Sequence, residues 1–170
     1  VATYNYLTFR LQEAPFGLSL TQASWLFLAY LAGAFASRQA WGFTARLPPV
    51  GVLILSISVM LAGLGLTLLP WLFAIVVGLV LFTIGFFGAH SIALTLVSRR
   101  ADPAARSLAP SLYNLGYYAG STLLGWAGGL AFAAAGWGGT VAMVAGLAML
   151  AAVLAWLHSA RNGGPRTVDA

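Results

Sequence analysis

The sequence contains no cysteine and no lysine, and only three of its 170 residues are acidic. The absence of cysteine excludes disulfides, thiolate metal sites and thiol nucleophiles. Charged residues make up 6% of the chain, whereas soluble domains carry about 25%. With 61% hydrophobic residues and a mean hydropathy of +0.91, this composition excludes a soluble globular domain.

Two stretches, 47–98 and 107–160, carry no charged residue at all. Each is long enough for two passes through a lipid bilayer and the turn between them, since one helical span needs roughly 20 mostly apolar residues. The apolar residues do not alternate as they do in barrel strands. Because helices satisfy their own backbone hydrogen bonds in lipid, the sequence predicts an all-α integral membrane protein.

The pattern predicts five complete spans and one truncated helix. The truncated helix, at about 1–9, is too short to cross a bilayer and lacks the basic start and cleavage site of a signal peptide. We therefore expect Val1 to lie inside a helix whose earlier turns are missing, so that the chain is a fragment. The complete spans are expected at 18–37, 50–70, 72–98, 107–135 and 137–157, forming a bundle over 1–158 that is followed by a disordered tail at 159–170.

The arginines predict the orientation of the bundle. With five spans, seven of the eight basic residues fall on one side of the membrane, and the eighth, Arg10, is offset by Glu13. These seven are Arg38, Arg46, Arg99, Arg100, Arg106, Arg161 and Arg166. Such an excess marks the cytoplasmic side, so the C-terminus is expected in the cytoplasm. The net charge of +5 thus reflects topology, and no nucleic-acid partner is expected.

His90 is the one acidic or basic side chain predicted well inside a span. A group that can ionise is costly in lipid, so such a residue commonly faces the bundle interior and serves a function, here as a polar or protonatable contact in a cavity. The alternative is a neutral histidine that only fixes helix packing. The sequence leaves both open.

A small and polar face on the next span supplies candidate partners for His90. Its members recur three or four residues apart, as one side of a helix requires: Ser107, Ser111, Asn114, Tyr118, Ser121, Gly125 and Gly128. We expect a contact from His90 to Asn114, Tyr113, Tyr117 or Tyr118. The face either lines a water-accessible path, which we favour, or provides interhelical hydrogen bonds worth about 0.6 kcal/mol each.

Tyr4 and Asn5 in the first segment are candidate solute contacts, although tyrosines at this depth also serve as interface anchors. Glycines predict the packing faces, because small residues let helix backbones approach closely. Two pairs are spaced four apart, Gly116 with Gly120 and Gly125 with Gly129, and Gly78, Gly85 and Gly88 lie roughly opposite His90.

Several kinds of chemistry have no residues to support them. The spans contain no carboxylate, no histidine pair at ligand spacing and no glycine-rich phosphate loop. The histidine precedes Ser121, which is the reverse of the order that a rhomboid-type serine protease needs. We therefore expect no metal, no cofactor and no enzymatic activity.

Three segments resemble one bacterial branch of the major facilitator superfamily, that of drug:proton antiporters. Tyr4–Leu11 (YNYLTFRL), followed by Pro15–Phe16, resembles the end of that family's seventh helix. Phe82–Ser91 (FTIGFFGAHS) resembles its tenth helix, and Ser111–Ser121 (SLYNLGYYAGS) resembles its eleventh. The loop after the predicted span 18–37 keeps Gly42 and Arg46 of the family pattern but has no aspartate, which departs from the family's gating motif.

The resemblance implies the C-terminal six-helix half of a bacterial inner-membrane transporter. Such a protein would move a small organic solute by alternating access, through proton-coupled efflux, together with an N-terminal half that this chain lacks. The cavity would be lined by helices seven, eight, ten and eleven. Two alternatives remain: a stand-alone six-span carrier or channel that dimerises, and a non-transporting membrane sensor or assembly protein.

Overall fold

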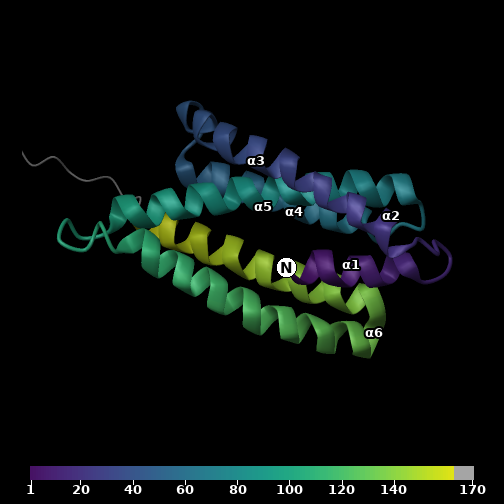
Figure 1. Ribbon diagram of the computed structural model, residues 1–170. Helices are drawn as coiled ribbons and strands as arrows, with labels where there is room; N and C mark the ends of the chain where they lie inside the picture. Colours follow the sequence, from purple (N-terminus) through teal and green to yellow (C-terminus); the bar gives the residue numbers. More distant parts are fainter. Residues whose placement is uncertain (163–170) are drawn as a thin grey trace, which may run out of the picture.

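The computed structural model describes residues 1–162, which form a bundle made only of helices (Figure 1). The all-α prediction is confirmed. In chain order the elements are α1 (Ala2–Gln12), α2 (Leu20–Ser24), the 3-10 helix η1 (Trp25–Leu28), α3 (Ala29–Ala40), the 3-10 helix η2 (Trp41–Ala45), α4 (Pro49–Leu66), α5 (Leu72–Arg100) and α6 (Ala109–Asn162).

The span expected at 18–37 is built from three consecutive pieces, α2, η1 and α3. A capping box starts it, in which the Ser19 side chain accepts from the Gln22 backbone and the Gln22 side chain accepts from the Ser19 backbone. The 3-10 turn of η1 interrupts the α-helix, and the helical conformation then continues past residue 37 to Ala40. The helix therefore runs three residues beyond the predicted end of this span.

The longest helix, α6, is a hairpin of two limbs. Ala135 and Gly136 have non-helical backbone angles, and Gly136 has a φ of 58°, a conformation that glycine adopts without a steric penalty. Figure 1 shows the limbs lying side by side, with the chain returning along the path it came by. The break lies where the predicted spans 107–135 and 137–157 meet. We call residues 109–134 the first limb and residues 137–162 the second limb.

The second limb extends further than the sequence predicted. It stays helical to Asn162, so the tail expected from residue 159 is helical over its first four residues. The helix-breaking sequence Gly–Gly–Pro comes only after Asn162, which explains the extension. The rest of the expected tail, 163–170, lies outside the described residues.

Three helices of the described part are long and apolar enough to cross a membrane, namely α4, α5 and α6. Length and composition count α6 once, although it turns back at Gly136. The interrupted segment from Leu20 to Ala40 is not among them, because no single helix in it is long enough.

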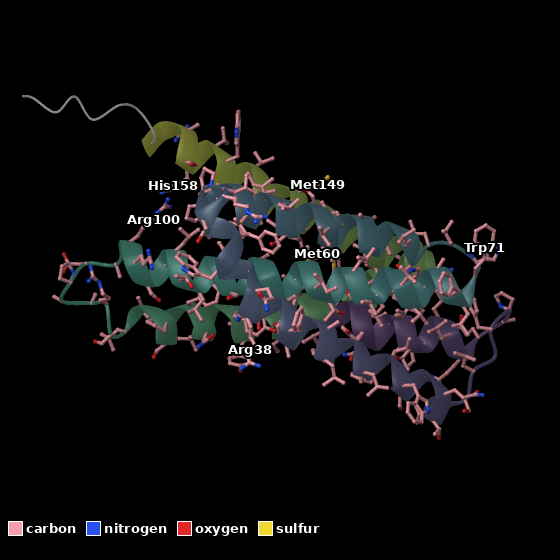
Figure 2. All side chains as sticks on the ribbon, turned by 90° about the horizontal axis from the view of Figure 1, so that it is seen from above. Arg38, Met60, Trp71, Arg100, Met149 and His158 are labelled. Atoms are coloured by element: carbon pink, nitrogen blue, oxygen red, sulfur yellow. The ribbon has the colours of Figure 1, made fainter. Side chains whose placement is uncertain are left out.

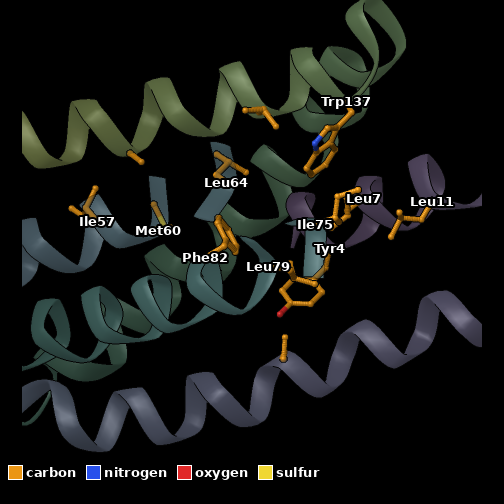
Figure 3. Close-up of a cluster of buried hydrophobic side chains, with 13 residues drawn as sticks. Tyr4, Leu7, Leu11, Ile57, Met60, Leu64, Ile75, Leu79, Phe82 and Trp137 are labelled. Carbon is orange, nitrogen blue, oxygen red and sulfur yellow. The ribbon is translucent and has the colours of Figure 1, made fainter. Parts of the chain in front are cut away.

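The bundle is centred on α5, which packs along α4 and α3. Close backbone contact joins α5 to α4 through glycines: a Cβ added at Gly78 would lie 2.6 Å from the carbonyl oxygen of Gly63. One added at Gly85 would collide with the backbone of Met60. These contacts lie on the face of α5 opposite His90, where glycine packing was expected. Large side chains such as Leu64 and Leu79 fill the adjoining core (Figure 3).

Three helix ends meet at Thr67: the C-terminal ends of α4 and α1 and the start of the second limb. The indole nitrogen of Trp137, at the start of the second limb, donates to the carbonyl oxygen of Thr67 at 3.1 Å and to its hydroxyl at 3.2 Å. Arg10, from the end of α1, donates to the same carbonyl and to those of Leu68 and Leu69. The last carbonyl oxygens of a helix have no hydrogen-bond donor within that helix. Here the side chains of Arg10 and Trp137 are the donors. We call this arrangement the Thr67 node.

Candidate functional site

His90 lies half-buried between α5 and the first limb of α6, against aromatic rings from both. The Tyr113 hydroxyl is 3.1 Å from Nδ1 of His90, and the ring of Tyr117 is centred 4.8 Å from the imidazole. This confirms the expected contact from His90 to the tyrosines of the next span. The expected Asn114 contact is not formed among the described residues, because Tyr113 occupies the position facing the imidazole.

Ring contacts continue from His90 in both directions and link five elements of the bundle. On one side they pass through Tyr117 to Tyr118; on the other they pass through Phe86 and Phe87 to Tyr30, where they reach α1 and η1. Neighbouring ring centroids are 4.6–6.3 Å apart, within the range of favourable aromatic pairs. We call this continuous surface the aromatic wall, and its members are Tyr4, Phe27, Tyr30, Phe86, Phe87, His90, Tyr113, Tyr117 and Tyr118.

Tyr4 holds the α1 side of this wall in place. Its hydroxyl is 2.6 Å from the hydroxyl of Thr83 on α5, and the residue is 5% exposed. Thr83 itself donates to the carbonyl oxygen of Leu79 at 2.7 Å, so Tyr4 is the donor to Thr83. Because the pair is buried, it fixes the position of α1 against the middle of α5.

Two adjoining cavities lie beside the wall. One, of about 280 Å³, is lined by His90, Tyr113 and Tyr117 together with Ile57 of α4. The other, of about 370 Å³, is lined by residues from α1, α4, α5 and both limbs of α6, and it shares Tyr117 with the first. Cavities of this size, apolar apart from a few converging polar groups, are typical of small-molecule sites.

The structure distributes the other predicted contact residues unevenly. Ser121 borders the 370 Å³ cavity, and Asn114 is half-buried on the first limb beside Tyr113. Tyr118 is 66% exposed and Ser111 is also exposed, on the same side of that limb. Asn5 is exposed on α1, away from the buried Tyr4. The structure thus brings His90, Tyr4 and Tyr118 into one wall and leaves Asn5 outside it.

The two glycine pairs of the first limb have different surroundings. A Cβ added at Gly129 would lie 2.6 Å from the Tyr6 hydroxyl, which donates to the carbonyl oxygen of Gly125 at 3.0 Å, so this pair packs on α1 as predicted. Gly116 and Gly120 have no described atom within 4 Å of an added Cβ. Gly116 and Gly120 thus meet no other helix among the described residues and border the 370 Å³ cavity, and the packing expected for this pair stays a prediction.

Four members of the wall were missed by the sequence analysis, and these are Phe27, Tyr30, Phe86 and Phe87. A signal was present, because Phe27 and Tyr30 are three residues apart, and Phe86 and His90 are four apart. Each spacing places both rings on one helix face. Aromatic residues are so common in apolar spans that this spacing alone did not distinguish them.

The described residues offer nothing for a metal ion, since no group of three or more histidine, cysteine or carboxylate side chains comes together among them. Every buried polar side-chain atom in the described part has a hydrogen-bond partner. The chemistry available at the wall is therefore recognition by rings, hydroxyls and one imidazole.

Comparison with known proteins identifies the family. The profile of the Major Facilitator Superfamily matches residues 4–169. The chain is 35% identical over 89% of its length to an uncharacterized MFS-type transporter, YybF, of Bacillus subtilis, covering 37% of that protein. It is 38% identical over 89% of its length to the inner membrane transport protein YnfM of Escherichia coli, covering 36% of it.

An uncharacterized transporter of Buchnera aphidicola from Schizaphis graminum is 35% identical over 76% of this chain, which covers 31% of that protein. No solved structure matches. The chain thus spans about a third of the length of these curated relatives. Since the family profile matches nearly every residue, the chain belongs to the Major Facilitator Superfamily of membrane transporters.

Proposed function

We propose that this chain is the C-terminal six-helix half of a secondary transporter of the bacterial inner membrane, which exports a small organic solute in exchange for protons. The missing N-terminal half would complete the transport path, and the two halves would rock about a central site. Supporting this, the curated relatives are about two and a half times as long as the chain, and one of them is described as an inner membrane transport protein.

In this proposal the chain crosses the membrane five times and contributes one incomplete helix. The incomplete helix is α1, the complete crossings are the α2–η1–α3 segment, α4, α5 and the two limbs of α6, and the C-terminus is cytoplasmic. The arginines support this orientation. Figure 2 shows Arg100 and His158 at one end of the bundle and Trp71 at the other, as expected for a basic cytoplasmic end and an aromatic outer interface.

The observation that carries the proposal is the aromatic wall around His90. It joins α1, α3, α5 and the first limb, the elements that correspond to the cavity-lining helices of the family resemblance. Tyr30 and Tyr118 leave part of their rings exposed and able to contact a solute. His90 would be a polar or protonatable contact, and Ser111, Asn114 and Ser121 would provide hydrogen bonds along the first limb. Asn5 would do so from α1.

The first test is the coding sequence upstream of Val1. The proposal expects an open frame of roughly 200 further residues with six more spans, since a family member has two six-helix halves. A frame that opened close to Val1 would favour the self-assembling carrier instead.

The second test is transport by the full-length protein in inverted membrane vesicles. A panel of sugars and fluorescent amphiphiles such as ethidium would be supplied with an imposed pH gradient, and uptake would be recorded together with proton movement. His90→Phe should reduce transport at least about tenfold while leaving expression and elution unchanged. Phe73→Leu is the matched control, because Phe73 is an aromatic residue of α5 that is 81% exposed. Equal transport by His90→Phe and wild type would show that the aromatic wall around His90 does not take part in transport.

A further inference from the structure

A third cavity, of about 620 Å³, lies where α4, α5 and the second limb converge. Its interior is apolar and is lined by residues such as Leu53, Leu96 and Leu154. It lies at the arginine-rich end of the bundle, where its lining extends along α5 from Ala93 to Arg100. It adjoins the 280 Å³ cavity and shares Leu53 and Ala93 with it, but of the two only the larger cavity is bordered by arginines.

Three basic side chains border this apolar cavity: Arg100 in the last turn of α5, and His158 and Arg161 in the last turns of the second limb. None of its lining residues is acidic. Ala93 and Arg100 are separated along α5 by about 10 Å of helix, as are Leu154 and Arg161 along the second limb. On both helices the apolar lining residues thus lie deeper in the bundle, and the basic residues lie at the C-terminal end of the helix.

The two adjacent arginines of α5 are both exposed but have different neighbours. The guanidinium of Arg99 lies 4.4 Å from the ring centroid of Trp41, a cation–π contact with η2. Arg100 borders the cavity. The carboxylate of Asp102, two residues further on, accepts from the backbone nitrogen of Ala104 at 2.8 Å. Arginines near helix C-termini also complement the helix dipole, but that effect does not require them to share a cavity.

We propose that this cavity binds one anionic phospholipid of the membrane leaflet on the arginine-rich side, with its phosphate between Arg100 and Arg161 and an acyl chain against the apolar lining. Two guanidinium groups at one opening repel each other and attract an anion, and basic pockets between transmembrane helices are suited to lipid phosphates. Free phosphate would leave the apolar interior unfilled. A zwitterionic lipid would bring an ammonium group toward the arginines, which lowers the attraction. The occupant is therefore an anionic lipid.

The test is native mass spectrometry of the full-length protein in detergent, titrated with phosphatidylglycerol, with phosphatidylethanolamine of the same acyl chains, or with inorganic phosphate. For wild type we expect the first phosphatidylglycerol adduct at about tenfold lower lipid concentration than the phosphatidylethanolamine adduct, as charge recognition near the membrane surface predicts. Inorganic phosphate should form no retained adduct.

The double variant Arg100→Gln with Arg161→Gln should abolish the preference for the anionic lipid. The control is Arg46→Gln with Arg106→Gln, which removes the same charge from exposed residues outside the cavity and should keep the preference. Val97→Trp, at a partly exposed lining position, should lower binding of both lipids by narrowing the cavity. Equal binding of the two lipids by wild type, an unchanged preference in the Arg100/Arg161 variant, or a retained phosphate adduct would each overturn the proposal. None of these results depends on transport activity.

Discussion

The two sides of α5 are built on opposite principles. Toward α4, glycines bring the two backbones into direct contact, so that no side chain could be added without moving a helix. Toward the first limb of α6, rings and hydroxyls meet with cavities between them. The first side leaves no room for repacking, whereas the second can exchange one set of contacts for another. A single helix can therefore have fixed contacts on one side and exchangeable contacts on the other.

The largest effect is expected from a methyl group added on the side of α5 that contacts α4. Gly63→Ala places a Cβ against the backbone of Phe82, which cannot give way as a side chain can. We expect a loss of about 2 kcal/mol or more in unfolding free energy, the upper range for overpacking. The measurement is the apparent melting temperature of the full-length protein in detergent, which should fall by roughly 5 °C.

Gly65→Ala is the matched control for that variant. Gly65 lies on the same helix but has no described atom within 4 Å of an added Cβ. It should gain up to about 1 kcal/mol from the higher helix propensity of alanine. Equal melting temperatures for the two variants would show that the α4–α5 contact is looser than the structure indicates.

On the side of α5 that faces the first limb, Tyr113→Phe should lower the unfolding free energy only moderately. It removes the hydroxyl beside Nδ1 of His90 but keeps the ring contact. Interhelical hydrogen bonds in membranes average about 0.6 kcal/mol, so the apparent melting temperature should fall by only about 1–2 °C. Tyr117→Phe, in which the ring contact with His90 is likewise kept, serves as control and should melt like wild type. A loss as large as that of Gly63→Ala would contradict the distinction between the two sides.

The smallest effect is expected at Gly116. A Cβ added at Gly116 meets no described atom within 4 Å, so Gly116→Ala should not lower the melting temperature of the full-length protein. Gly128→Ala on the same limb is the comparison, because its Cβ would lie 2.9 Å from that of Ala2. Melting temperatures of the two variants would compare a glycine that packs against another helix with one that does not. A marked loss from Gly116→Ala alone would mean that another part of the full-length protein packs there.

The sequence predicted one side of α5 better than the other. Glycines opposite His90 indicated a packing face, and the apolar length of each span left few arrangements for it. Spacing alone could not predict the surroundings of the first limb. The pairs Gly116–Gly120 and Gly125–Gly129 have the same spacing, yet only the second faces α1, because helical periodicity defines a face without specifying its neighbour. Phe27 and Tyr30 were missed for the same reason, since their ring partners come from elements distant in sequence.

The Thr67 node has a mechanical consequence. Hydrogen bonds from Arg10 and Trp137 converge on one carbonyl oxygen, so the adjoining ends of α1, α4 and the second limb cannot separate without breaking them. The arginine-rich end of α5 lies about 40 Å away along its 29 residues. If these helices bend, the node is the natural pivot. We expect the amplitude of bending to increase with distance from Thr67 and to be greatest around Arg100.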